Sequence, residues 1–317
     1  MGIRYLNNYF YSNCKKGIYN INIDQLSNKK IAIDASIYMY NYKVKGDLIE
    51  YMYKMIFIFR SHSIHPVFIF DGKPPPEKNQ ILKERREKKR EAFENINILT
   101  TKMKQCIENS KKYNTIQQQI LNLKKRTIRL TMEDINNVKK LLKLCGITYY
   151  EADGEADSLC AKLVTKNIVW ACMSDDMDLF IYGCPRVIRK YNIFTGRALL
   201  YNSKELLTEL NMNSNTFKEI CVVSGTDYNN NNNNNIYKTL KYYNEYINDK
   251  KGNDFYGWLD KNTNYIEDYH KLCLCYLLFD LNNYNIKKYY NIKIHNTPVN
   301  TYELCRYLKN YNFIFIE

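Results

Sequence analysis

The stretch that decides the fold runs from Gly146 to Tyr182 and reads GITYYEADGEADSLCAKLVTKNIVWACMSDDMDLFIY. Two apolar runs within it, residues 147–150 and 168–173, predict buried strands, and residues 155–166 between them have helical character. A strand, a helix and a second strand of this length are typical of a βαβ unit, in which the two strands are parallel. The stretch therefore predicts an α/β fold.

Acidic residues follow both of these predicted strands. Glu155 and Asp157 come after the first strand, and Asp176 and Asp178 come after the second. An open parallel sheet binds its ligands beyond the carboxyl ends of the strands, where these acids would lie. Carboxylates held this close repel each other and raise each other's pKa unless a cation joins them. The pattern therefore predicts a divalent-metal site.

Two more predicted strands, residues 30–33 and 66–70, end in Asp34 and Asp71. One acid after a strand can simply cap the next helix, but four such strands at one sheet edge are harder to explain by capping. We expect a central, mostly parallel twisted sheet with helices on both faces and acids that converge on one edge. Further strands are predicted at residues 187–191 and 289–294, and helices at residues 4–11, 35–42, 48–61, 131–145, 199–210, 215–223 and 302–308.

The composition agrees with a folded protein that binds a polyanion. The chain has 317 residues and a net charge of +14, and 45% of its residues are hydrophobic. A basic surface around an acidic pocket suits a substrate that is held through its phosphates. Part of the lysine excess can equally reflect coding bias, because tyrosine and asparagine are abundant too. The ten cysteines lack paired zinc spacing, which argues against a zinc site.

The sequence shows no signal peptide and no apolar run near the roughly 18 residues of a membrane helix. We therefore expect a soluble intracellular protein, with its compartment left open.

A basic segment begins two residues after Asp71. Residues 73–90 read KPPPEKNQILKERREKKR, and cations continue at Lys124, Lys125 and Arg126. The predicted helices are polar most of the way round, which is typical of solvated helices and of helices that need a partner. Because the segment starts beside a predicted site acid, it would stand over the pocket and present its cations to a phosphate backbone.

Five motifs in this order resemble those of the flap endonuclease family, within the structure-specific 5′-nuclease superfamily. They are residues 1–3 (MGI), 31–36 (IAIDAS), 66–75 (PVFIFDGKPP), 152–157 (ADGEAD) and 174–178 (SDDMD). The resemblance covers roughly residues 1–228. It implies a phosphodiesterase that acts on DNA with two Mg²⁺ (or Mn²⁺) ions.

Carried onto this sequence, the resemblance assigns one ion to Asp34, Asp71, Glu155 and Asp157, and the other ion to Asp176, Asp178 and Asp227. Asp157 stands where the family has glutamate, so its shorter side chain would reach the ion through water. Lys78 and Arg85 fall where the family places catalytic cations over the scissile phosphate.

The resemblance also implies a path for the DNA. Tyr40 falls where an aromatic ring of the family stacks on a base beside the cut. The cations expected to guide the single strand are Lys83, Arg86, Lys88, Lys89, Arg90, Lys124, Lys125 and Arg126.

Residues 1–228 would form the nuclease core, with a helical arch at about residues 73–130, and residues 229–317 a helical C-terminal DNA-binding region. After Asp227 the family carries a glycine-rich hairpin that grips duplex DNA through backbone N–H groups. Here residues 229–235 are an unbroken asparagine run, which predicts a solvated loop. Without glycine the backbone approaches phosphates less closely, so we expect a degenerate helix-hairpin-helix with a weaker duplex grip.

The resemblance implies a nuclease that cuts DNA at 5′ flaps, or acts as a 5′→3′ exonuclease, in replication, repair or recombination. Two alternatives stay open: a superfamily member that acts on junctions, bubbles or RNA 5′ ends, and a catalytically silent scaffold that binds DNA structures. The expected partner is DNA with a 5′ single-stranded flap or end. We expect the protein to bind it as a monomer and to have no membrane partner. No clamp-binding motif precedes Glu317, so the sequence does not support recruitment by a sliding clamp.

Overall fold

The computed structural model describes residues 2–105, 110–229, 233–249, 254–283, 289, 294 and 296–315. Its centre is a seven-stranded sheet in the order β1-β7-β6-β5-β2-β3-β4. The strands from β6 to β4 are parallel, and β7 and β1 add an antiparallel edge. The strands are β1 (Ile18–Asn22), β2 (Lys30–Asp34), β3 (His65–Phe70), β4 (Thr148–Glu151), β5 (Ala171–Met173), β6 (Arg186–Asn192) and β7 (Arg197–Asn202).

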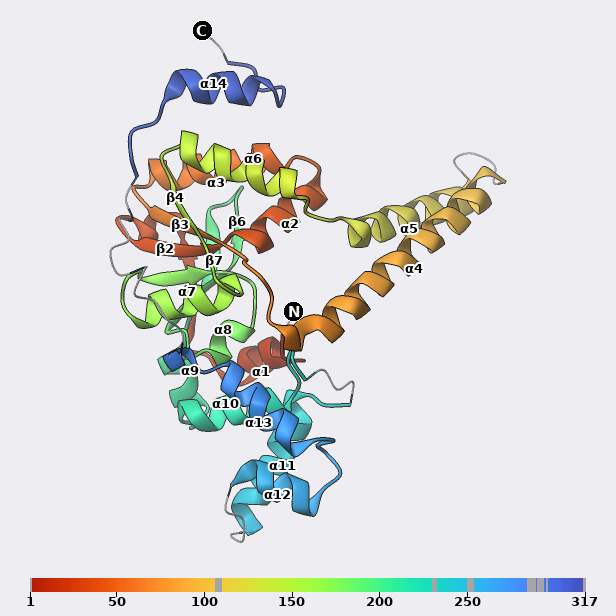
Figure 1. Ribbon diagram of the computed structural model, residues 1–317, viewed down its shortest axis with the longest axis vertical. Helices are drawn as coiled ribbons and strands as arrows, with labels where there is room; N and C mark the ends of the chain where they lie inside the picture. The colour runs from red at the N-terminus through yellow and green to blue at the C-terminus, as the bar shows by residue number, and fades with distance from the viewer. Residues whose placement is uncertain are drawn as a thin grey trace.

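Both faces of the sheet are buried, because side chains alternate between them along each strand. Ala32 and Val67 belong to a hydrophobic cluster on one face, and Ile33 and Phe68 belong to a second cluster on the other. Helices cover both clusters, so the predicted mostly parallel α/β fold is confirmed (Figure 1). The helices on the first face are α1 (Leu6–Asn13), α7 (Ala156–Thr165), α8 (Asp178–Ile181) and α10 (Ser214–Val223), and those on the second are α2 (Ala35–Lys45), α3 (Leu48–Ser61) and α6 (Met132–Leu144).

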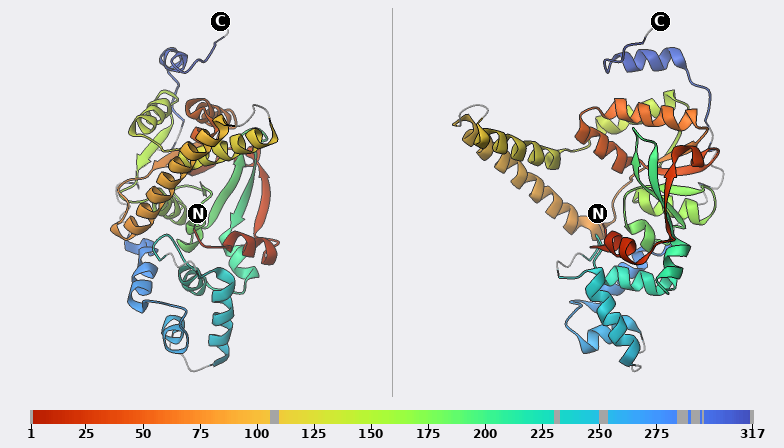
Figure 2. Two further views of the ribbon diagram at one scale, coloured as in Figure 1. Left: turned by 90° about the vertical axis from the view of Figure 1, so that its right-hand side faces the viewer. Right: turned by 180° about the vertical axis from the view of Figure 1, so that it is seen from behind.

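Two long helices, α4 (Asn79–Lys104) and α5 (Lys111–Thr127), pack side by side and project from the body of the molecule (Figures 1 and 2). Ala92, Ile116 and Ile120 are buried within this pair. The two mostly polar helices therefore serve as partners for each other. We call α4 and α5 the arch helices.

The C-terminal helices pack in two separate places. Helices α11 (Ile236–Asp249) and α13 (Tyr269–Leu278) pack on α10. Helix α12 (Phe255–Asn262) packs on α11 and on α13. Helix α14 (Thr301–Lys309) packs instead on α6, at the opposite end of the molecule (Figure 1). The remaining short elements are η1 (Ile23–Leu26), η2 (Pro76–Lys78), α9 (Ser203–Glu209) and η3 (Leu281–Asn283). Within the described ranges, no helix combines the length and the apolar character needed to cross a membrane.

Three expected elements differ from the structure or lie largely outside the described residues. The prediction of a single helix at residues 199–210 is wrong. The first residues of this range belong to the strand β7, which pairs with both β1 and β6, and only α9 is helical. Pairing with neighbouring strands here outweighs local preference. The strand predicted at residues 168–173 is confined to β5, since the chain turns after α7 before entering the sheet. The strand predicted at residues 289–294 lies largely outside the described residues.

Gly72 makes a tight backbone contact just beyond β3. Its N–H donates to the Gly154 carbonyl at 2.7 Å, and a Cβ added to Gly72 would lie 2.0 Å from the carbonyl oxygen of Ala152. We predict that Gly72→Ala lowers the free energy of unfolding by about 1–3 kcal/mol, because the backbone around Ala152 must move. Thermal unfolding followed by circular dichroism measures this loss. Gly154→Ala is the matched control, since, its two chain neighbours apart, no heavy atom of the described residues lies within 4 Å of a Cβ added there. Equal Tm values for the two variants would contradict the prediction.

Candidate active site

Asp34 and Asp71 lie at the carboxyl ends of two neighbouring parallel strands. Asp34 is the last residue of β2 and caps α2, accepting a hydrogen bond from the Ile37 N–H at 3.4 Å. Asp71 follows β3, and its two oxygens accept from the Ala156 N–H at 2.9 Å and from the Ser36 hydroxyl at 2.5 Å. Asp71 therefore joins the end of β3 to the first turns of α7 and α2.

The remaining acids come from three further segments. Glu155 is the N-cap residue of α7, and Asp157 lies in the first turn of the same helix. Asp176 and Asp178 follow β5, and the Asp176 carboxylate accepts a hydrogen bond from the Asp178 N–H at 3.0 Å. Asp227 lies in the turn that follows α10. Helix starts suit carboxylates because their first N–H groups lack partners within the helix.

Electrostatic coupling shows that acids from different segments lie close together. Burial, followed by the charges of Asp71 and Asp176, raises the pKa of Asp34 to about 8. Burial also raises the pKa of Asp157, with further contributions from Glu155 and Asp176. Both shifts reflect the cost of placing like charges together away from water. Asp176 is thus a neighbour of acids that follow two different strands.

Asp178 connects this group to the turn after α10. Its pKa is raised by burial first and then by Asp176 and Asp227. Its Oδ1 is buried and has no hydrogen-bond partner among the described residues, and a Cβ added to Gly2 would lie 2.6 Å from it. The structure therefore brings together the full set of acids chosen from the sequence: Asp34, Asp71, Glu155, Asp157, Asp176, Asp178 and Asp227.

Two cations from the start of the arch helices reach into this acid cluster. Lys78 in η2 forms an ion pair with Glu155, and its Nζ lies 3.3 Å from Oδ2 of Asp227. Arg85 Nη2 lies 2.6 Å from the same Asp227 oxygen. Burial disfavours the charged form of Lys78, but Glu155 and Asp227 outweigh it and raise the pKa of Lys78 above its ordinary value. Lys78 therefore keeps its charge and offsets part of the repulsion in the cluster.

The donor set suits a hard divalent cation. Within the described part of the chain, no three Asp, Glu, His or Cys side chains converge closely enough to enclose an ion by themselves. Mg²⁺ keeps several waters and is usually bound through one or two carboxylates, so it does not need three acids that enclose it directly. The buried Oδ1 of Asp178 offers an oxygen that has no hydrogen-bond partner among the residues that the structure describes. These carboxylates therefore fit hydrated Mg²⁺ or Mn²⁺.

The residues expected to contact DNA lie on α2 and the arch helices. The Tyr40 hydroxyl donates to the Lys125 carbonyl at 3.3 Å, so Tyr40 touches the end of α5. Lys89 Nζ donates to the Ile128 carbonyl at 3.1 Å. The exposed cations are Lys83, Arg86, Lys88, Arg90, Lys124, Lys125 and Arg126. Base stacking by Tyr40 and strand guidance by these cations stay predictions.

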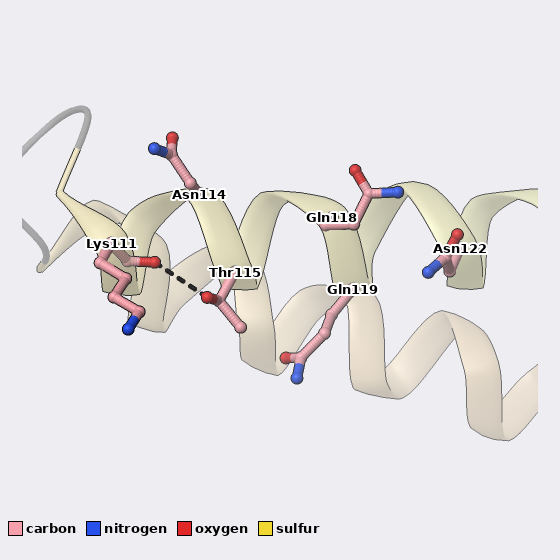
Figure 3. A pocket seen from close by; sticks show the side chains of 6 residues that line it. All are labelled: Lys111, Asn114, Thr115, Gln118, Gln119 and Asn122. Carbon is pink, nitrogen blue, oxygen red and sulfur yellow. Dashed lines mark hydrogen bonds between the residues drawn. The ribbon is translucent and has the colours of Figure 1, made fainter.

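A shallow polar groove runs along the outer part of α5 (Figure 3). The Thr115 hydroxyl turns back to donate to the Lys111 carbonyl at 2.9 Å, while Gln118 and Gln119 point to different sides of the helix (Figure 3). The lining residues are Lys111, Asn114, Thr115, Gln118, Gln119 and Asn122. With amides and one lysine but no acid in its lining, this groove is unsuited to metal chemistry.

The asparagine run is not a solvated loop throughout, contrary to the prediction. The Asn229 side chain accepts hydrogen bonds from the Thr226 N–H at 2.9 Å and from the Thr226 hydroxyl at 2.5 Å. Asn234 is only 6% exposed, and its amide donates to the Val223 carbonyl at 3.1 Å. The physical reason is that asparagine side chains can satisfy backbone groups within turns. Residues 230–232 lie outside the described part of the run.

Two polar side chains that hold the acids in place were not predicted from the sequence. The Tyr228 hydroxyl donates to Glu155, and the Ser174 hydroxyl donates to Oδ2 of Asp34 at 3.0 Å. In each of these two hydrogen bonds the donor lies far from the acid along the sequence, so no local pattern indicates the contact. The one available signal was adjacency, because Tyr228 directly follows Asp227.

Carboxylates at the carboxyl edge of an open α/β sheet, with cations entering from a basic helical pair, are typical of enzymes that cleave phosphate esters. The fold and the site therefore place this chain in the class of α/β phosphodiesterases.

Comparisons with known proteins identify the family. The protein-family model of the XPG N-terminal domain matches residues 1–92, and the family model of the XPG I-region matches residues 146–227. A probable RAD2-like endonuclease of Invertebrate iridescent virus 6 is 30% identical over 289 residues, which cover 75% of this chain and 68% of the viral protein. Flap endonuclease 1 of Glycine max is 29% identical over 248 residues, covering 72% and 62% of the two chains. The chain belongs to the XPG/flap endonuclease family of 5′ nucleases.

The chain thus spans between 62% and 68% of the length of these two relatives. Its fold is also that of the catalytic core of Rad2, solved in complex with DNA substrate. The TM-score is 0.65 at 19% sequence identity, and the match covers 98% of this chain and 95% of the Rad2 chain.

We predict that Mg²⁺ stabilises the protein and that Asp176→Asn removes most of this effect. A cation that binds only the folded state at about 100 times its Kd adds about 2.7 kcal/mol to the free energy of unfolding. Thermal unfolding with Mg²⁺ and with EDTA measures this gain. Asp175→Asn is the matched control, because Oδ1 of Asp175 accepts from the Lys190 N–H at 2.8 Å and an amide oxygen can replace it. An equal Mg²⁺-dependent rise in Tm in wild type and Asp176→Asn would contradict the ligand assignment.

Proposed function

We propose that this protein is a divalent-metal-dependent, structure-specific 5′ nuclease that hydrolyses DNA phosphodiesters at 5′ flaps or acts as a 5′→3′ exonuclease. The observation that carries the proposal is the convergence of acids from four strand ends and one turn, with Lys78 and Arg85 entering among them. A protein that only binds DNA has no use for so many buried like charges, which are costly to hold together. The cluster therefore favours a catalyst over a silent scaffold.

Two Mg²⁺ or Mn²⁺ ions in this cluster would supply an activated water and would stabilise charge on the attacking and leaving oxygens. Asp34, Asp71, Glu155 and Asp157 would hold one ion, and Asp176, Asp178 and Asp227 the other, in each case partly through the waters that Mg²⁺ retains. With water activated in this way, no histidine base is required from the chain.

Lys78 and Arg85 would bind the scissile phosphate. Both now contact carboxylates at the base of the arch helices, so a phosphate entering the cluster offers each of them an alternative anionic partner. Their positive charges would then offset the charge that develops on the phosphate in the transition state. Because the two side chains belong to η2 and the start of α4, they also tie the position of the arch to the reacting group.

The arch cations and Tyr40 would position the single strand. Exposed lysines and arginines on α4 and at the end of α5 offer contacts to successive phosphates. Tyr40, which touches the end of α5, would stack on a base next to the cut. In this proposal residues 1–228 are the nuclease core, residues 73–130 its arch, and residues 229–317 a helical DNA-binding region. A monomer of this kind would act in the nucleus or at a cytoplasmic viral replication site.

The turn after α10 favours a second candidate substrate class. Asn229 and Asn234 fill this turn with side-chain hydrogen bonds, where the resemblance implies a glycine-rich backbone that grips duplex DNA. A weaker grip on duplex would shift preference towards substrates that are recognised through their single strand or branch point. Junctions, bubbles and RNA 5′ ends are such substrates.

A panel of labelled substrates tests the proposed function. Purified protein is incubated with a 5′-flap DNA, a nicked duplex, a four-way junction and a single-stranded RNA, first with Mg²⁺ and then with EDTA. We expect Mg²⁺-dependent cleavage, greatest on the flap, and loss of cleavage in Asp176→Asn. Binding without cleavage of any substrate would support the scaffold instead, and preferred cleavage of the junction or the RNA would support the second class.

Lys78→Ala should slow chemistry more than it weakens DNA binding. Removing one preorganised donor to developing charge costs roughly 10²–10³ in rate, whereas the arch retains its other cations for binding. Single-turnover cleavage at saturating enzyme gives the rate, and fluorescence anisotropy in EDTA gives the Kd. Lys140→Ala, on the exposed side of α6 beside Tyr307, controls for loss of one surface charge. Equal losses in rate and affinity would reduce the role of Lys78 to general phosphate attraction.

A further inference from the structure

We propose that Tyr228 is a positioning residue that fixes the Glu155 carboxylate for cation binding. The proposal rests on the function proposed above and assigns a role within the same site. It starts from the division of the Glu155 oxygens: Lys78 contacts Oε1, and the Tyr228 hydroxyl donates to Oε2. Each oxygen of this carboxylate therefore has its own donor.

The two donors differ in how firmly they are held. Lys78 has a long, flexible side chain. Its Nζ also lies 3.3 Å from Oδ2 of Asp227, which gives it a second anionic partner. Tyr228 is a rigid ring that is only 7% exposed. Its ring packs edge-on against Phe279, with centroids 5.3 Å apart. Because the proposed mechanism transfers Lys78 to the scissile phosphate, Tyr228 would be the donor that stays on Glu155 during the reaction.

The backbone around Tyr228 is held as firmly as the ring. Its N–H donates to the Thr226 hydroxyl at 3.2 Å, and that hydroxyl donates in turn to the side chain of Asn229 at 2.5 Å. Tyr228 directly follows Asp227 in this turn. One short segment thus supplies a candidate ligand for one ion and the hydroxyl that orients a candidate ligand for the other. This arrangement couples the geometry of the two halves of the acid cluster.

Tyr228 would also help to hold Lys78 before substrate arrives. The Nζ of Lys78 lies 5.7 Å from the centroid of the Tyr228 ring, within the range of a cation–π contact. Removing the hydroxyl while keeping the ring leaves this contact in place. Tyr228→Phe therefore isolates the hydrogen bond to Glu155, which is the part of the contact that the proposal concerns.

A structural role alone predicts a different result. A buried tyrosine whose hydroxyl merely satisfies a core acceptor would change the Tm when the hydroxyl is lost, but it would not change metal affinity. Tyr256 is such a residue: it is also 7% exposed, and its hydroxyl donates to the Glu219 carbonyl at 3.0 Å. Tyr256→Phe is therefore a control matched in side chain, burial and type of loss.

The test measures Mn²⁺ binding to the full chain without DNA, by electron paramagnetic resonance of free Mn²⁺. Loss of a residue that orients a metal ligand typically costs about 10-fold to 100-fold in metal affinity. We expect Tyr228→Phe to weaken Mn²⁺ binding at least about 10-fold and Tyr256→Phe to leave it unchanged. Unchanged affinity in Tyr228→Phe would overturn the inference and leave the proposed nuclease intact. Absence of Mn²⁺ binding by the wild type would overturn both.

A double-mutant cycle guards against an indirect effect of Tyr228→Phe on folding. If Tyr228 acts through Glu155, the losses of Mn²⁺ affinity in Tyr228→Phe and Glu155→Gln are not additive. The double variant should then bind Mn²⁺ about as weakly as Glu155→Gln alone. Additive losses would show that Tyr228 acts by another route and would overturn the assignment. The Tm of each variant, measured in EDTA, verifies that the compared proteins are folded.

Discussion

Repulsion among buried carboxylates is the constraint on which the sheet edge depends. Burial raises the pKa of Asp34, Asp157 and Asp178, and their neighbours raise each of these pKa values further. A buried charge without a partner is costly, so this edge holds together only where positive charge or hydrogen-bond donors oppose the acids. Within the described residues, Lys78 and Arg85 supply that charge. The acid cluster and the start of the arch helices are therefore parts of one electrostatic unit.

In the proposed function, this unit would link the binding of a divalent cation to the binding of a phosphate. A phosphate that attracts Lys78 and Arg85 would take compensating charge away from the acids, and the repulsion between the acids would rise. A divalent cation that binds the acids would lower this repulsion and release the two side chains for the phosphate. Each ligand would then favour binding of the other, a reciprocity that thermodynamic linkage requires. The position of the arch would follow the same equilibrium, because Lys78 directly precedes α4.

A feature of the fold or the site could be predicted from the sequence only where neighbouring residues carry the pattern that indicates it. Acids after apolar runs are a local pattern, and a parallel sheet brings its strand ends to one edge, so the convergence of Asp34, Asp71 and Asp176 followed from the sequence. The strand β7 was missed because its partners β1 and β6 come from other parts of the chain. Contacts such as that between Tyr228 and Glu155 were missed for the same reason, since 73 residues separate the partners.

In the proposed function, the turn after α10 would serve chemistry and duplex binding through different groups. The acid cluster needs this turn only to place Asp227 and its neighbour Tyr228. Gly225, at a φ of 100°, turns the backbone there, and hydrogen bonds between Thr226 and the Asn229 side chain help to hold the turn. A phosphate grip, in contrast, requires backbone N–H groups that face outward and stay unpaired within the turn. The Thr226 N–H already has a partner in Asn229. Asparagine side chains in this segment therefore help to hold the turn that places Asp227, and in the proposed function they would grip duplex DNA less closely than a glycine-rich backbone does.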